Sequence, residues 1–194
     1  EYLVIESKDD NIIASYYDML TSLYGDIGNY DKLLEYSLLN RDIKLRNIGE
    51  NSYPYAVSLI NLSEAYADSQ QKEKGKECLD QASQIIIRLY GENSKEYYDV
   101  LHKQSSYIQS NEDGKKHFEK RLSLSKKLFG KNSIQYGEDL CWYSLFLMYQ
   151  LEDHHAIDVI QEGLNILKGI DGYDRYSLFF LGQLFSWYHV SDDY

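Results

Sequence analysis

A block of about 42 residues recurs along this chain of 194 residues. Each copy starts with Gly, which is followed by a short polar stretch and then by Tyr a few residues later. The glycines stand at positions 49, 91, 130 and 172, so the successive steps are 42, 39 and 42 residues. A motif that recurs at such a period marks one supersecondary unit that is copied and stacked. The sequence therefore predicts a repeat protein rather than a domain built around one central core.

Each block reads as the end of one helix and the start of the next. Gly after an apolar helical run takes the left-handed conformation at low cost and so ends a helix. Asn or Ser two or three residues later can cap the first turn of a new helix. Pro54, the single Pro of the chain, falls in such a first turn, where its missing N–H costs nothing. Because interior Pro breaks helices, its absence elsewhere favours an all-α fold.

Two amphipathic helices fill each block. The first carries apolar residues at i, i+3 and i+7 and a small residue at i+4, as in Leu59–Tyr66. A polar turn follows, and then a second helix with an apolar stripe of its own, such as Gly75, Leu79 and Ile86. We expect helices at residues 9–25, 28–47, 53–68, 71–89, 95–110, 113–128, 134–149, 153–169 and 174–190.

These helices define the repeat boundaries. We expect the whole chain, residues 1–194, to form one array of about four and a half repeats. Residues 1–6 take the place of the end of a preceding second helix, so we expect this array to be a segment of a longer protein. The predicted units span approximately residues 7–48, 49–90, 91–129, 130–171 and, with a first helix only, 172–194.

Composition excludes several classes of partner. The chain carries 31 Asp and Glu against 20 Lys and Arg, a formal net charge of −11. This balance disfavours nucleic acid and anionic membranes as partners, since both need a basic face. No stretch reaches the roughly 18 apolar residues of a membrane-spanning helix. Cys78 and Cys141 are too few for a disulfide framework and read as small hydrophobic residues, so we expect a cytoplasmic protein.

The search for catalytic chemistry is negative. The sequence has no Gly-rich phosphate loop, no His-Glu-x-x-His pattern and no Cys pair at zinc spacing. His154 and His155 are adjacent, so on a helix they would point about 100° apart and could not hold a metal together. Cys141 has no basic neighbour in the sequence to lower its pKa. We therefore predict no enzymatic activity, no metal site and no cofactor.

The repeat resembles the tetratricopeptide repeat (TPR), specifically the 42-residue kind seen in kinesin light chains and in bacterial proteins. Leu59-Ile60-Asn61-Leu62-Ser63-Glu64-Ala65-Tyr66 and Gly28-Asn29-Tyr30 carry the resemblance, which covers nearly the whole chain. It implies a right-handed α-α superhelix of antiparallel helix pairs, with the first helices lining a concave groove. The third unit departs from the pattern at Gln104 and Ser105-Ser106, and we expect a kink there.

The resemblance implies a protein–protein interaction scaffold that binds a peptide or protein partner in the groove. An alternative is a regulatory or sensor segment of a larger multidomain enzyme, because similar arrays occur beside caspase-like peptidase domains. The ends of a truncated array leave apolar faces uncovered. We therefore also expect self-association through the uncapped repeat ends.

Groove-facing positions follow from the geometry of the family. The N-terminal part of this set is acidic and polar, and the C-terminal part is apolar and aromatic. We therefore expect a ligand with a basic stretch at one end and an apolar anchor at the other. In the alternative interpretation, the acids only solubilise an exposed face and the aromatic residues belong to the core or to a junction with missing repeats. The predicted groove residues are Asp18, Ser22, Asp26, Ile60, Glu64, Asp68, His102, Ser106, Gln109, Glu138, Cys141, Leu145, Tyr149 and Phe179.

Overall fold

The computed structural model describes residues 9–168, 170 and 172–191, with only the backbone for residues 174–176 and 188–191. Every regular element in this part of the chain is helical, which confirms the predicted all-α fold. The expected remnant of a preceding helix at residues 1–6 lies outside the described residues. In chain order the elements are α2 (Asp10–Asp26), α3 (Tyr30–Ile48), α4 (Tyr53–Asp68), α5 (Lys72–Tyr90), α6 (Lys95–Gln104), the short 3-10 helix η1 (Ser105–Tyr107), α7 (Asn111–Phe129), α8 (Ile134–Leu151), α9 (Ala156–Leu167) and α10 (Asp174–Ser191).

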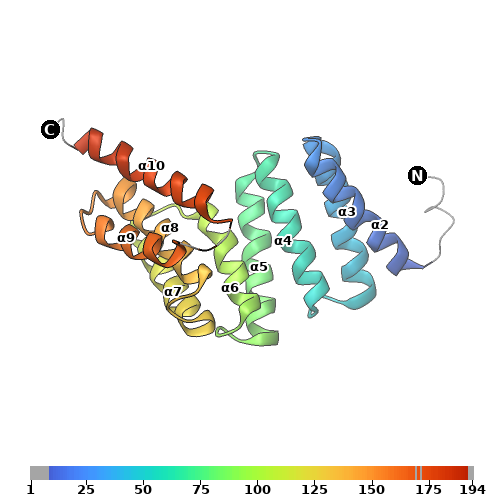
Figure 1. Ribbon diagram of the computed structural model, residues 1–194. Helices are drawn as coiled ribbons and strands as arrows, with labels where there is room; N and C mark the ends of the chain where they lie inside the picture. Colours follow the sequence, from blue (N-terminus) through green and yellow to red (C-terminus); the bar gives the residue numbers. More distant parts are fainter. Residues whose placement is uncertain (1–8, 169, 171, 192–194) are drawn as a thin grey trace. The chain divides into compact units, whose positions relative to one another are not determined.

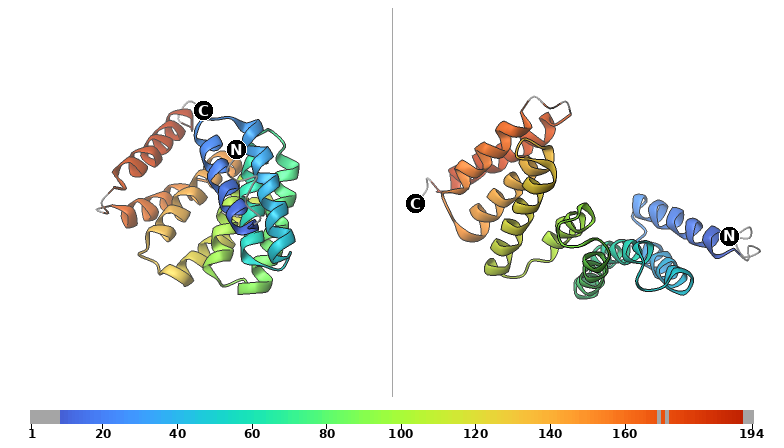
Figure 2. Two further views of the ribbon diagram at one scale, coloured as in Figure 1. Left: turned by 90° about the vertical axis from the view of Figure 1, so that its right-hand side faces the viewer. Right: turned by 90° about the horizontal axis from the view of Figure 1, so that it is seen from below.

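The chain divides into two compact units, residues 1–107 and residues 108–194. In the first unit α2 packs on α3, α3 on α4, α4 on α5, and α5 on α6. In the second unit α7 packs on α8 and α8 on α9, while α10 contacts both α9 and α8. Figures 1 and 2 show the consecutive helices of each unit side by side. Within each unit the helices thus stack in the order of the sequence, as a repeat protein requires.

The repeated block forms the predicted stop and start signals. The Gly at each of its first three copies follows a helix and has a φ between 82° and 89°, in the region that favours Gly. Three residues later a Ser hydroxyl accepts a hydrogen bond from the main-chain N–H of a Tyr, as Ser94 Oγ does from Tyr97 at 3.1 Å. The Tyr of the block is buried in all three copies, namely Tyr55, Tyr97 and Tyr136.

Small side chains bring the helices of the first unit close together. On α4 the fully buried residues include Ala56, Leu59 and Ala65, and on α5 they include Leu79 and Ala82. Gly75 of α5 lies against the α4 backbone, where an added Cβ would sit 2.8 Å from the carbonyl oxygen of Ser63. The apolar stripes are therefore buried only because consecutive helices touch.

The same close approach occurs in the second unit, between α8 and α9. An added Cβ at Gly163 of α9 would sit 2.8 Å from the carbonyl oxygen of Gly137 and 2.7 Å from Sγ of Cys141. Around this contact the core of the unit includes Ile160 and Phe180, both with no exposed surface. Gly163 is therefore required by backbone packing and not by backbone conformation.

A buried ion pair joins α7 to α8. Nε of Arg121 donates to Oδ1 of Asp139 at 2.8 Å, and Nη2 lies 2.7 Å from the same oxygen. The two side chains are 2% and 1% exposed. Burying either charge alone would be costly, so each residue depends on the other. The pair therefore links α7 to α8 at a buried position of the second unit.

The predicted helix at residues 95–110 is wrong beyond residue 104. The α-helix ends at Gln104, and Ser105–Tyr107 form one 3-10 turn. The Ser105 hydroxyl donates back to the carbonyl oxygen of Leu101 at 3.3 Å, and Tyr107 Oη donates to the carbonyl oxygen of Ser63 on α4 at 2.8 Å. The Ser105 bond turns back onto α6, and the Tyr107 bond ties the segment to α4, at the polar residues where the sequence departs from the repeat. The kink expected there stays a prediction.

Gly163→Ala tests the close approach of α8 and α9. We expect a loss of about 1–3 kcal/mol in the free energy of unfolding, because the new methyl group has no room. Gly182→Ala on α10 is the matched control, since an added Cβ there meets nothing within 4 Å. That control should be neutral or stabilising by up to about 1 kcal/mol, the helix-propensity gain from Gly to Ala. Urea unfolding followed by circular dichroism measures both, and equal stabilities for the two variants would contradict the packing argument.

Candidate binding surface

A hollow of about 380 Å³ lies in the first unit between α2, α3 and α4. We call it the acidic hollow, because four carboxylates stand around it. Five of the predicted groove residues meet here, three from α2 and two from α4. The lining consists of Asp18, Thr21, Ser22, Gly25, Asp26, Leu33, Ser37, Asn61, Glu64, Ala65 and Asp68.

The repeat places these side chains. Ser22 and Glu64 are 42 residues apart, and so are Asp26 and Asp68, so each pair occupies the same position of two consecutive first helices. On each helix the two positions are four residues apart and therefore share a face. Ala65 is small, which leaves space between the helices. The predicted groove residues omit six residues of the lining, two from α3 and four from α2 and α4. They are Leu33, Ser37, Thr21, Gly25, Asn61 and Ala65.

Asp18 serves the helix pair more than the open surface. Nδ2 of Asn40 donates to its Oδ1 at 2.7 Å, and Nζ of Lys44 lies 3.0 Å from the same oxygen. Both partners belong to α3. The carboxylate of Asp18 is therefore largely neutralised within the first repeat, and only part of it faces the hollow.

Negative charge concentrates at the C-terminal ends of α2 and α4. Glu64 forms an ion pair with Lys103 of α6. Asp26 and Asp68, in contrast, are exposed and make no ion pair with any residue that the structure describes. Each is the last residue of its helix, where the helix dipole is also negative. Among the described residues, the acidic hollow therefore presents two carboxylates without a paired cation, and the negative ends of two helix dipoles add to their charge.

The third repeat adds little to this surface. His102, Ser106 and Gln109 are exposed, but none of them lines the acidic hollow. Ser106 lies in η1, and Gln109 lies in the loop after it. Neither residue is therefore on the α-helix that was predicted to carry it. Ile60 of α4 is half-buried and lies outside the lining as well.

The prediction that Cys141 faces a groove is wrong. Its side chain has no exposed surface and touches Gly163 in the core of the second unit. The reason is the alignment of the repeats. Cys141 of the fourth repeat corresponds to Asp18 of the first, and Gly163 corresponds to Asn40. That position faces the second helix of the same repeat. Burial, and secondarily the nearby Glu138, raises the pKa of the Cys141 thiol to about 12, so it is not an activated nucleophile.

The remaining predicted residues of the second unit are partly exposed. Glu138 is half-buried, and burial raises the pKa of its carboxyl while a hydrogen bond with Tyr173 opposes that shift. Leu145 packs on the core from its edge. Tyr149 Oη lies 3.0 Å from Oε1 of Gln183, which links α8 to α10. Phe179 is 45% exposed, so an aromatic surface is present.

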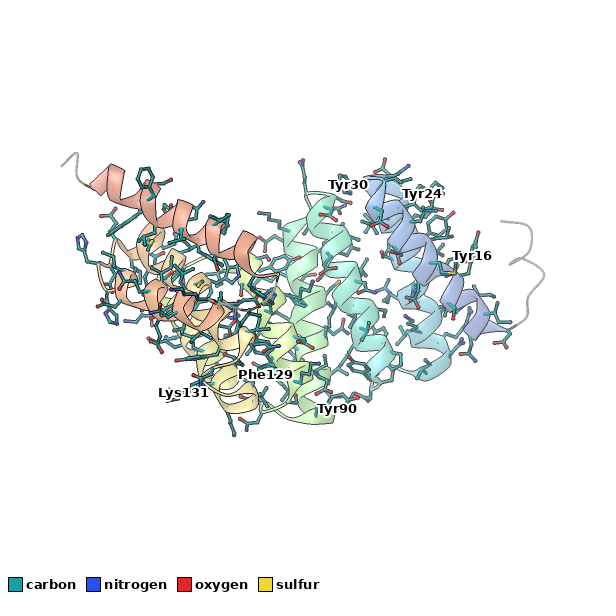
Figure 3. The ribbon with its side chains drawn as sticks, viewed as in Figure 1. Tyr16, Tyr24, Tyr30, Tyr90, Phe129 and Lys131 are labelled. Atoms are coloured by element: carbon teal, nitrogen blue, oxygen red, sulfur yellow. The ribbon has the colours of Figure 1, made fainter. Side chains whose placement is uncertain are left out.

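Apolar side chains are exposed on the first and last helices that the structure describes, α2 and α10. On α2, Met19 is 71% exposed, and on α10, Leu178 and Phe185 are 66% and 65% exposed. Tyr16 and Tyr24, labelled in Figure 3, also belong to α2, and both are half-buried. Such stripes on first helices are what self-association through repeat ends would use, and that self-association stays a prediction.

The described residues do not gather metal-binding side chains at one place. They contain no group of three or more His, Cys, Asp or Glu that could hold a metal ion. His154 packs edge-on against the ring of Trp187, and His155 lies 3.5 Å from Asp158 at the start of α9. No helix in this part of the chain is long and apolar enough to cross a membrane.

Comparison with known proteins supports the fold. No protein-family model matches the sequence, and no curated protein matches it. Among solved structures, the chain is similar to BtubC (BKLC) from P. vanneervenii, a bacterial kinesin light chain-like TPR protein. The match has a TM-score of 0.73 at 19% identity and covers 87% of this chain and 68% of BtubC. This likeness confirms the all-α TPR fold that the sequence predicts.

The burial of Cys141 makes a testable prediction about its reactivity. A pKa of about 12 in place of 9.0 lowers the thiolate fraction at pH 8 roughly a thousand-fold. We therefore expect the Cys78→Ser variant, in which Cys141 is the remaining thiol, to react with a disulfide reagent only after unfolding. Because the folded-state pKa is raised, this thiol stabilises the fold fully below pH 9, and that contribution is lost as pH rises towards 12.

The Cys141→Ala variant is the control, since it leaves the half-buried Cys78. It should react measurably in the folded state. Rapid labelling of Cys141 in native protein at pH 8, measured by absorbance of the released thiol, would contradict its assigned burial.

Proposed function

We propose that this chain is a non-enzymatic interaction scaffold that binds a basic peptide segment of a protein partner in the acidic hollow. The TPR fold supports a scaffold role in general, because its stacked helices form a rigid surface without chemistry of its own. The observation that carries the specific proposal is the pair Asp26 and Asp68, exposed at two neighbouring helix ends and without ion pairs among the described residues.

The charge of the hollow selects the ligand. Of its four carboxylates, Asp18 and Glu64 already have a cation, whereas Asp26 and Asp68 have none among the residues that the structure describes. A Lys or Arg side chain brought to the two free carboxylates would gain attraction from both and from the two helix dipoles. An acidic segment would meet repulsion from the same groups. The surface therefore favours a basic segment by attraction and disfavours an acidic one.

The size of the hollow limits what it can hold. Its volume of about 380 Å³ is at the lower end of the range for ligand pockets, roughly 300–1,000 Å³. It suits one or two side chains of a peptide rather than a folded domain. A regulatory segment of a larger enzyme would use the same surface, so one binding experiment addresses both functions. The apolar anchor expected for the other end of the ligand stays a prediction.

The double variant Asp26→Lys/Asp68→Lys tests the proposal. We expect a labelled peptide with four Lys or Arg residues to bind the wild-type chain and to bind this variant at least about ten-fold more weakly, a difference of about 1.4 kcal/mol. Lys at the end of a helix is compatible with its dipole, so folding should be preserved. Fluorescence anisotropy at about 50 mM salt measures the affinity, and circular dichroism checks the fold.

Glu50→Lys/Glu77→Lys is the matched control. It makes the same change in net charge at two exposed acids that do not line the hollow. We expect it to reduce the affinity far less. Equal losses in the two double variants would show that only net charge matters, and stronger binding of a Glu-rich peptide would overturn the proposal.

A further inference from the structure

A second hollow lies in the second unit, between α9 and the turn that joins α7 to α8. Its volume of about 630 Å³ exceeds that of the acidic hollow, and we call it the amide hollow. Figure 3 labels Lys131 in the turn. The residues come from that turn and from a second helix, so the predicted groove positions include none of them. They are Lys131, Asn132, Asp158, Gln161, Glu162, Asn165 and Ile166.

Three side-chain amides with open hydrogen-bonding capacity face this hollow. Asn132, Gln161 and Asn165 line it, are exposed, and make no side-chain hydrogen bond to any described residue. Each amide offers an acceptor oxygen and two donor hydrogens. A peptide main chain presents the complementary set, one donor and one acceptor at almost every residue. The amide hollow therefore fits a peptide backbone better than a charged small molecule.

The spacing of two of these amides matches an extended chain. Gln161 and Asn165 are four residues apart on α9, so they share a face and are separated by about 6.0 Å along the helix axis. In an extended peptide, residues i and i+2 are about 6.4–6.8 Å apart and point the same way. The amides can thus bond to every second residue of a peptide that runs along α9.

A column of acids runs beside the column of amides. Asp158 and Glu162 have the same four-residue spacing, and both line the hollow. Alternate side chains of the same extended peptide would therefore reach both carboxylates. Asp158 also lies 3.5 Å from His155, an exposed contact that a stronger cation can replace. Lys131 on the opposite wall repels basic side chains and so keeps them on the α9 side.

We infer that the amide hollow is a second peptide site, which binds an extended segment with Lys or Arg at alternate positions. Gln161 and Asn165 bond its main chain, while Asp158 and Glu162 pair with its basic side chains. The site shares no residue with the acidic hollow, so either site can exist without the other.

The test is a titration of isotope-labelled full chain with the blocked peptide acetyl-Thr-Arg-Thr-Arg-Thr-amide, followed by NMR. We expect the side-chain NH₂ resonances of Asn132, Gln161 and Asn165 to shift together and to saturate. The NH₂ resonance of Asn61 reports the acidic hollow in the same spectra, since Asn61 lines that hollow. A response at Asn61 alone would support the proposed function and overturn this inference.

Two matched controls separate main-chain recognition from charge. The peptide N-methylated at its central residues keeps both Arg side chains but loses main-chain donors, and it should bind about five- to ten-fold more weakly. Gln161→Ala/Asn165→Ala should weaken binding of the unmodified peptide to a similar extent. Gln150→Ala, at an exposed amide outside the hollow, should leave binding unchanged.

Three results would overturn the inference. They are no saturable shift of the three amides at several millimolar peptide, equal affinity for the N-methylated peptide, and equal affinity of the Gln161→Ala/Asn165→Ala variant. A loss of affinity in Gln150→Ala as large as in the double variant would also count against it.

Discussion

The closeness of consecutive helices is the constraint on which the two units depend. Gly163 of α9 lies against the backbone of α8 at Gly137, and Gly75 of α5 lies in the same way against α4 at Ser63. A helix in such a stack has no other place to bury its apolar stripe than on its neighbours. Where the separation grows by about 0.5–1 Å, the facing atoms lose roughly a quarter to a half of their contact energy. Small residues at a few positions thus make burial possible for many large ones.

The same stacking arranges the candidate sites. Asp26 and Asp68 are 42 residues apart, so they occupy the same position of consecutive first helices, and both line the acidic hollow. The acidic hollow is therefore a direct product of the repeat. The amide hollow differs, because it lies between a turn and α9, and the repeat pattern does not predict it. The two hollows thus differ in origin, since the lining of one follows the repeat and the lining of the other is local.

Much of the fold could be predicted from the sequence, because capping and periodicity are local properties. Ser94 and Gly91 mark a helix start and a helix end whatever the surroundings are. The end of α6 could not be predicted in this way, since it depends on Tyr107 reaching Ser63, 44 residues away. Cys141 was misplaced for a similar reason, because an amphipathic stripe does not say which flank of it faces the partner helix. Asp26 and Asp68 are both among the predicted groove residues because their separation of 42 residues puts them at the same position of consecutive repeats.

The shared position of Asp18 and Cys141 has a consequence for how such arrays change over time. In the first repeat it holds a carboxylate bonded to Asn40, and in the fourth a thiol against Gly163. Cys141→Asp would bury a charge that has no amide partner. Asp18→Cys would remove the carboxylate that Asn40 bonds and would leave a gap. The repeats are alike in outline but not exchangeable as parts, because each has been fitted to its own second helix. Duplication can lengthen such a chain in one step, whereas each new copy must then acquire its own matching pair.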